Sequence, residues 1–152
     1  MRRKDKEIKD KSAIEKILRQ AAVCRIAMCD GDVPYVVPMS FGYEEGCLHL
    51  HSASEGRKID VLKRNPTVCF ELDIGQELAG GENPCKTSLK YRSVIGYGKA
   101  VFVEDREEKK RSLDAIVRHY SGQAYDYPEE SLNEAAIIRI RIESMTGKQS
   151  GG

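Results

Sequence analysis

Apolar positions recur along the chain with two periods, one typical of strands and one typical of helices. In the segment CLHLHS at residues 47–52 they alternate strictly, which places successive side chains on opposite faces of a strand. Such segments predict six strands, at residues 22–29, 35–43, 47–52, 67–73, 88–103 and 136–142. Apolar residues three and four positions apart predict helices at residues 12–21, 55–64 and 105–120.

Turn signals between these segments indicate how the strands pair. Asp30-Gly31-Asp32 and Glu44-Glu45-Gly46 each join two strands through a few residues, so those strands are expected to be antiparallel neighbours. Gly96 and Gly98 share one face of a long strand, as bent barrel strands require. The pattern therefore predicts a mainly β fold, an antiparallel barrel with peripheral helices.

Three polar stretches carry no such period. The glycine-rich segment 75–86 and the segment 121–134 are predicted to be loops, and the final GKQSGG is predicted to be a frayed tail. We expect one domain over residues 1–152, frayed at about residues 1–10 and 148–152.

Composition narrows the class of protein. With 40% hydrophobic and 32% charged residues, the chain is typical of a soluble globular domain, and a net charge of +1 gives no electrostatic reason to expect nucleic acid or a membrane as partner. The charged N-terminus lacks the apolar stretch of a secretory signal, and no apolar run approaches the roughly 20 residues of a membrane span. We expect a cytoplasmic protein.

Cysteine and histidine spacing bears on metal binding. Five cysteines without a C-x-x-C pair indicate reduced thiols rather than a disulfide framework or a zinc knuckle. Cys47, His49 and His51 share one strand face, an arrangement that can bind zinc, but no further ligand is near in sequence. We therefore predict no metal site, and either a surface position or a hydrogen-bonded structural role for His49.

The start of the second predicted helix breaks a local rule. Ser54 is a plausible N-cap, which places Arg57 and Lys58 in the first turn, where unpaired N–H groups already carry partial positive charge. Each cation there costs roughly 0.3–1 kcal/mol. A phosphate would reverse the sign, since it could accept from the N–H groups, the Ser52 or Ser54 hydroxyl, Arg57 and Lys58. A solvated basic helix is the alternative.

Pro38 interrupts a predicted strand. Proline cannot donate to a strand ladder, so it marks a sheet edge, a bulge or an opening. Backbone groups near Val37 and Met39 are then free to bind a flat ring with an amide-like edge. An ordinary edge strand is the alternative.

Three motifs taken together resemble a known superfamily. They are VVPMSFGYEEGCLHLHSASEGRK at residues 36–58, NPTVCFELD at 65–73 and KYRSVIGYGKA at 90–100. They resemble the FMN-binding split-barrel superfamily of pyridoxamine 5′-phosphate oxidase, and within it the nitroimidazole-resistance (Nim-type) flavoproteins. The terminal ESMTGKQ is similar too, and the resemblance extends over roughly residues 5–149. It implies a six-stranded antiparallel split barrel and a homodimer with FMN, or alternatively FAD, between the subunits.

The resemblance also implies a role for particular residues. The phosphate would lie on Arg57 and Lys58, the ring along residues 36–39, and His51 beside the flavin as the catalytic residue. The residues that it assigns to the cofactor are Val36, Val37, Pro38, Met39, His51, Ser52, Ala53, Arg57, Lys58, Ser93 and Lys148. Lys148 would approach the flavin of the partner subunit.

The function implied is an FMN-dependent oxidoreductase, similar to nitroimidazole reductases, that acts on a small molecule. The flavin would carry out the redox chemistry, while His51 would donate a proton. The chain lacks the arginine-led segment with which the oxidase proper binds its substrate near the C-terminus, which argues against pyridoxamine 5′-phosphate oxidation. The alternatives are a non-catalytic flavin- or haem-binding carrier or sensor, and an interaction domain without a cofactor.

Overall fold

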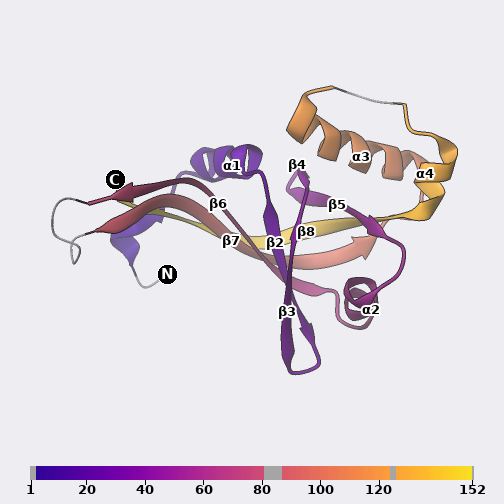
Figure 1. Cartoon of the computed structure of the whole chain (residues 1–152), viewed down its shortest axis with the longest axis horizontal. Coiled ribbons are helices and arrows are strands. Elements are labelled where there is room, and N and C mark those ends of the chain that lie inside the picture. Colours follow the sequence, from indigo (N-terminus) through magenta and orange to yellow (C-terminus); the bar gives the residue numbers. More distant parts are fainter. Residues whose placement is uncertain (1–2, 81–86, 124–125, 152) are drawn as a thin grey trace.

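The computed structural model describes residues 3–80, 87–123 and 126–151, and consists of one long bent sheet with helices packed against it (Figure 1). The helices are a short 3-10 turn, η1 (Lys4–Lys6), and α1 (Lys11–Gln20), α2 (Arg57–Arg64), α3 (Arg106–Ser121) and α4 (Glu129–Glu134). The strands are β1 (Glu7–Ile8), β2 (Cys24–Asp30), β3 (Val33–Met39), β4 (Gly42–Glu44), β5 (Cys47–Ala53), β6 (Thr67–Ala79), β7 (Ser88–Phe102) and β8 (Ala135–Ser150). None of the described helices is long and apolar enough to cross a membrane.

The strands pair only in antiparallel fashion, in the order β3-β2-β6-β7-β8-β5-β4, and β1 adds to β8. The two end strands, β3 and β4, do not pair with each other, so the barrel stays open. The predicted mainly β split barrel with peripheral helices is therefore confirmed. The described residues form eight strands rather than six. β1 is an addition, and the predicted strand 35–43 divides between Met39 and Gly42, where the chain changes its partner from β2 to β5.

Three polar segments are more regular than their sequence predicts. β6 and β7 remain paired beyond a bulge at Ile74, as far as Ala79, so the predicted loop 75–86 begins inside a strand and its residues 81–86 lie outside the described ones. Residues 147–150 of the predicted frayed tail are the end of β8, held by β7 on one side and by β1 on the other, and Gly152 lies outside the described residues. α4 lies in the predicted loop 121–134.

The core lies on one face of the sheet. Leu48, Leu50, Phe70 and Ile138 are almost fully buried there, and α1 and α2 contribute further apolar side chains. Gly96 lies on this face of β7, where a Cβ atom would overlap the ring of Phe70. Glycine is therefore needed at position 96 for space, which is a different reason from the strand bending that the sequence suggested.

The opposite face, here called the outer face, is only partly covered. Registered neighbours form a row across it from Val36 through Ala27 and Cys69 to Tyr97. Large apolar side chains at Val36, Ile95, Tyr97 and Val101 are exposed on these strands. Helix α3 covers the β4–β5 end of the sheet (Figure 1), so most of the remaining outer face is open to a partner or ligand.

Candidate functional site

The start of α2 is open in the way that an anion site requires. The N-cap is Gly56 rather than the predicted Ser54, and no side chain caps the helix. Gly56 has φ 113° and ψ 171°, a conformation essentially restricted to glycine, which explains why the helix starts later than predicted. No atom lies within 4 Å of where a Cβ atom of Gly56 would be. The first-turn N–H groups of a helix have no partner within the helix, and no side chain caps them here.

Arg57 is fixed against the β2–β3 hairpin. Its Nε donates to Oδ2 of Asp30 over 3.0 Å, and its guanidinium carbon lies 4.5 Å from the centre of the Tyr35 ring. The other oxygen of Asp30 accepts from Arg64 at 2.6 Å. The hydrogen bonds from Arg57 and Arg64 hold the pKa of Asp30 below its usual value.

Lys58 follows in the same turn and is half-buried. Burial lowers the pKa of its ammonium group. A phosphate bound next to Lys58 would stabilise the charged form of the ammonium group and offset this effect of burial.

Strand β5 ends beside this helix and places His51, Ser52 and Ala53 opposite Ile137, Ala136 and Ala135 of β8. His51 and Ala53 are exposed and Ser52 is half-buried. Only residues 54–56 separate the strand from α2, and His51 lies on the surface near the end of that strand.

Strand β3 is an end strand of the sheet, which confirms that Pro38 marks an edge. Val36 and Pro38 face outward and are exposed, while Val37 is half-buried and Met39 lies in the core. The side chain of Met39 therefore cannot line a surface site, although its backbone can. Tyr35 of the same strand contacts Arg57, so the start of α2 reaches β3 on the face opposite to Val36 and Pro38.

Ser93 and Lys148 are brought together with each other but lie apart from Arg57. They are register partners on β7 and β8, and the ammonium group of Lys148 donates to the Tyr91 hydroxyl over 2.8 Å. Three strand spacings, roughly 14 Å, separate β7 from the β3 edge. Within one chain, the predicted cofactor residues therefore fall into two groups on different strands.

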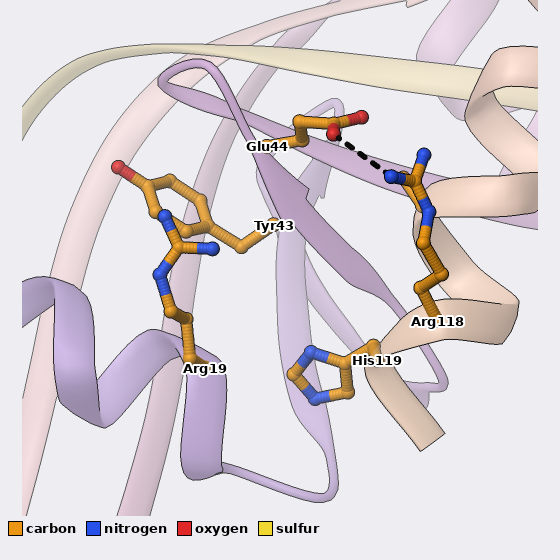
Figure 2. Close-up of a pocket in the computed structure, with 6 residues that line it drawn as sticks. Arg19, Tyr43, Glu44, Arg118 and His119 are labelled. Carbon is orange, nitrogen blue, oxygen red and sulfur yellow. Dashed lines mark ion pairs between the residues drawn. The ribbon is translucent and has the colours of Figure 1, made fainter. Parts of the chain in front are cut away.

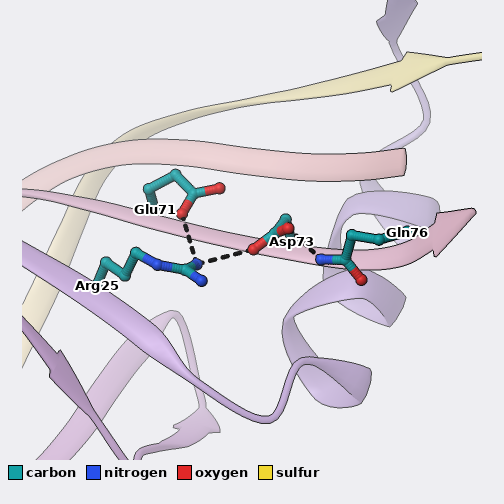
Figure 3. Close-up of polar contacts among 4 residues, drawn as sticks. All are labelled: Arg25, Glu71, Asp73 and Gln76. Carbon is teal, nitrogen blue, oxygen red and sulfur yellow. Dashed lines mark hydrogen bonds and ion pairs between the residues drawn. The ribbon is translucent and has the colours of Figure 1, made fainter. Parts of the chain in front are cut away.

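A charged network missing from the sequence prediction lies between these two groups (Figure 3). Arg25 of β2 donates to Glu71 over 3.0 Å and to Asp73 over 2.8 Å, and Gln76 donates to Asp73. Burial and the neighbouring Asp73 raise the pKa of Glu71. Opposite charges at outward positions of β2 and β6 were the available signal, but the sequence did not show that these strands pair.

A hollow of about 280 Å³ lies between α1, α3 and β4, and Figure 2 shows residues that line it. Its lining residues are Arg19, Tyr43, Glu44, Ala115, Arg118 and His119. Arg118 pairs with Glu44 at 3.6 Å, and His119 donates from Nε2 to the backbone oxygen of Ala21 at 2.7 Å. Arg19 lies over the Tyr43 ring, 5.3 Å from its centre. These contacts join the two helices to the sheet, and none involves a predicted site residue.

The histidines of β5 do not form a metal site. His49 lies under α3, and its Nδ1 is 3.0 Å from the Ser112 hydroxyl, which confirms the predicted structural role. His51 is exposed instead. Within the described ranges, no three His, Cys, Asp or Glu side chains are grouped closely enough to bind a metal ion.

Comparisons with known proteins agree with this geometry. A sequence model of the family described as pyridoxamine 5′-phosphate oxidase matches residues 10–149. A candidate 5-nitroimidazole antibiotic resistance protein from Bacteroides thetaiotaomicron is 40% identical, with a TM-score of 0.85 over 94% of this chain and 86% of that one. A search of curated proteins found no significant match.

More distant structures share the fold. The flavocytochrome Anf3 from Azotobacter vinelandii is 19% identical, with a TM-score of 0.85 over 100% of this chain and 72% of that one. The FAD and haem binding protein from Mycobacterium smegmatis is 16% identical, with a TM-score of 0.86 over 97% of this chain and 74% of that one. The family match, the 40% identity and the shared split barrel show that this chain belongs to the pyridoxamine 5′-phosphate oxidase family.

Proposed function

We propose that this protein is an FMN-dependent oxidoreductase that holds the flavin by its phosphate at the start of α2 and reduces a small nitroaromatic compound of the nitroimidazole type. The observation that carries the proposal is the open helix start at Gly56, followed directly by Arg57 and Lys58. The 40% identity to a candidate 5-nitroimidazole resistance protein supports the substrate class.

The residues present fit a flavin phosphate. The first-turn N–H groups can donate to phosphate oxygens, Arg57 adds a planar fork of donors, and half-buried Lys58 adds a point charge. The β3 edge, with exposed Val36 and Pro38, offers an apolar strip and edge-facing backbone groups to the ring. FMN has both a phosphate and a flat ring with an amide-like edge, so it matches both parts.

The flavin, when bound, would supply the electrons for reduction. Reduction of a nitro group to a nitroso group takes up two electrons and two protons and releases water. His51 lies near the end of β5, the strand that precedes α2, and it is exposed. We assign it the delivery of a proton to a nitro oxygen.

We further propose that the site is completed by a second copy of the chain. Ser93 and Lys148 lie on β7 and β8, three and four strands away from β3 in the order of the sheet. In a dimer joined through the outer face, Ser93 and Lys148 of one subunit can meet the start of α2 of the other. Exposed Ile95 and Tyr97 on that face support this arrangement.

The phosphate assignment is tested by comparing FMN with riboflavin, which has the same ring without the phosphate. The wild type is expected to bind FMN more tightly than riboflavin. In Arg57→Ala, the affinity for FMN should fall about 10- to 100-fold because charge-assisted hydrogen bonds are lost, while the affinity for riboflavin should hardly change. Both dissociation constants can be measured from the quenching of flavin fluorescence.

Lys63→Ala is the matched control, since it removes one positive charge from the other end of the same helix. It should leave the ratio of the two affinities unchanged. Equal affinities of the wild type for FMN and riboflavin would contradict the phosphate site.

The second candidate function is a flavin carrier without rapid turnover. It is supported by the two distant structures with the same fold, a flavocytochrome and an FAD and haem binding protein. An absorbance spectrum of the purified protein separates flavin from haem. The carrier would be favoured if nicotinamide donors do not reduce the bound flavin and nitroimidazoles do not reoxidise it.

A further inference from the structure

Asp30 links two cations of α2 to the β2–β3 hairpin. One carboxylate oxygen accepts from Nε of Arg57 at 3.0 Å and the other accepts from a terminal nitrogen of Arg64 at 2.6 Å. The Asp30 side chain is more buried than either arginine, which are 52% and 62% exposed. The carboxylate is thus the fixed centre of the group.

The contacts of Arg57 leave the N–H groups of its two terminal nitrogens available to a ligand. Asp30 engages Nε, and Tyr35 covers one face of the guanidinium plane. A guanidinium has five N–H donors, four of them on its terminal nitrogens. Those terminal nitrogens form the fork that matches two oxygens of a phosphate. Within the described part of the chain, Asp30 is the one ion-pair partner of Arg57.

The charges indicate that Asp30 holds Arg57 in place rather than competing with a phosphate for it. One carboxylate is shared by two guanidinium groups, so the group keeps a net positive charge, to which Lys58 adds. An arginine side chain loses considerable rotamer freedom when it binds a ligand. A guanidinium that is already held on its Nε edge and on one face has less of that freedom to lose.

We propose that Asp30 is a positioning residue for the flavin phosphate, which fixes Arg57 with its terminal fork directed to the start of α2. The proposal rests on the function proposed above, because it needs a phosphate at that place. Arg64 acts one step further away, by holding the second oxygen of Asp30.

The test is Asp30→Asn, which keeps the shape of the side chain and removes its charge. If Asp30 positions Arg57, the FMN-to-riboflavin affinity ratio falls about 3- to 10-fold, the range expected for loss of exposed ion pairs in a network. If Asp30 only competes with the phosphate for Arg57, the ratio rises, because a negative charge near the phosphate has gone. The two roles therefore give opposite signs.

Asp32→Asn is the matched control. Asp32 belongs to the same hairpin turn, is exposed, and carries the same charge. Its removal reports the long-range electrostatic effect alone, so the ratio should stay constant or rise slightly. An Asp30→Asn result equal to that of Asp32→Asn would overturn the proposal.

A double variant tests whether Asp30 acts through Arg57. Adding Asp30→Asn to Arg57→Ala should change the ratio no further, since there is no guanidinium left to position. An additional fall in the double variant would overturn the assignment. A wild-type ratio near one contradicts the phosphate site itself, whereas a high wild-type ratio that Asp30→Asn leaves unchanged contradicts only the role of Asp30.

Discussion

His49 and His51 lie two positions apart on β5 and have different surroundings. His49 is only 8% exposed beneath α3, whereas His51 is exposed near the end of the strand. Alternation along the strand predicts correctly that the two point to the same face. It cannot predict that a helix more than 50 positions later covers one of them, since that depends on tertiary packing.

The exposed histidine carries the catalytic prediction. In His51→Ala with FMN bound, reoxidation of the chemically reduced flavin by a 5-nitroimidazole should be about 100-fold slower, the lower range for loss of a general acid. Stopped-flow absorbance of the flavin measures this rate. The affinity for FMN should change little.

His51→Gln separates proton transfer from hydrogen bonding. Glutamine can still donate a hydrogen bond but cannot deliver a proton, so this variant should be as slow as His51→Ala. A wild-type rate in either variant would remove His51 from the chemistry.

At the scale of elements, α3 is joined to the sheet by one buried and one partly exposed polar contact. Nδ1 of His49 meets the Ser112 hydroxyl, which is 1% exposed, and Arg139 of β8 donates to Glu108 at 3.5 Å. Burial lowers the pKa of His49. The charged groups around it, from β4, the following turn, α3 and β8, are Glu44, Glu45, Glu108, Arg111, Arg118 and Arg139.

The lowered pKa of the buried His49 predicts that the stability of the protein depends on pH. Because the pKa of His49 is lower in the folded state, the unfolded chain binds the extra proton as the pH falls below about 6.5. The free energy of unfolding should therefore decrease between pH 7.5 and pH 5.5, and decrease less in His49→Gln. Urea unfolding at the two pH values measures both.

His51→Gln serves as the control, because it removes an exposed histidine from the same strand. It should lose as much stability as the wild type over this pH range. Equal losses in His49→Gln and the wild type would contradict the role given to the buried imidazole.

The elements also show why part of the fold was predictable. Strands over the core, such as β2 and β5, begin and end within about two residues of their predicted bounds, because one face is apolar. The ends of β6 and β8 extend beyond that core, where pairing with β7 and β1 rather than burial holds them. Their polar residues carry no strand period, so sequence alone could not reveal them.

The candidate site was predictable to a similar degree. Arg57, Lys58 and Pro38 break local rules, and such breaks are visible in a sequence. Asp30 and Tyr35 were missed because they follow ordinary turn and strand patterns. Asp30 meets Arg57 across 27 positions, and only the folded hairpin brings the two together.

At the scale of the whole molecule, the open outer face carries the proposal of a dimer. Tyr97 lies at one end of the row Val36–Ala27–Cys69–Tyr97 and is 53% exposed. Exposed apolar side chains in one row are typical of a surface that meets a partner. A second copy in that position would also bring the missing Ser93 and Lys148 to the flavin.

The corresponding prediction is that the protein has a mass in solution of twice 17.1 kDa, and that Tyr97→Asp dissociates it. A buried, unpaired carboxylate at an interface costs a few kcal/mol, enough to raise the dissociation constant of the dimer roughly 100-fold.

Val33→Asp is the matched control: Val33 is 56% exposed, but it projects from the opposite face of the sheet, so the dimer should persist. Because the flavin site is shared, Tyr97→Asp should lose FMN affinity together with the dimer, as light scattering and fluorescence can show on one sample. Particles of 17.1 kDa that retain the flavin would mean that one subunit suffices, and the contribution of Ser93 and Lys148 would then have no basis.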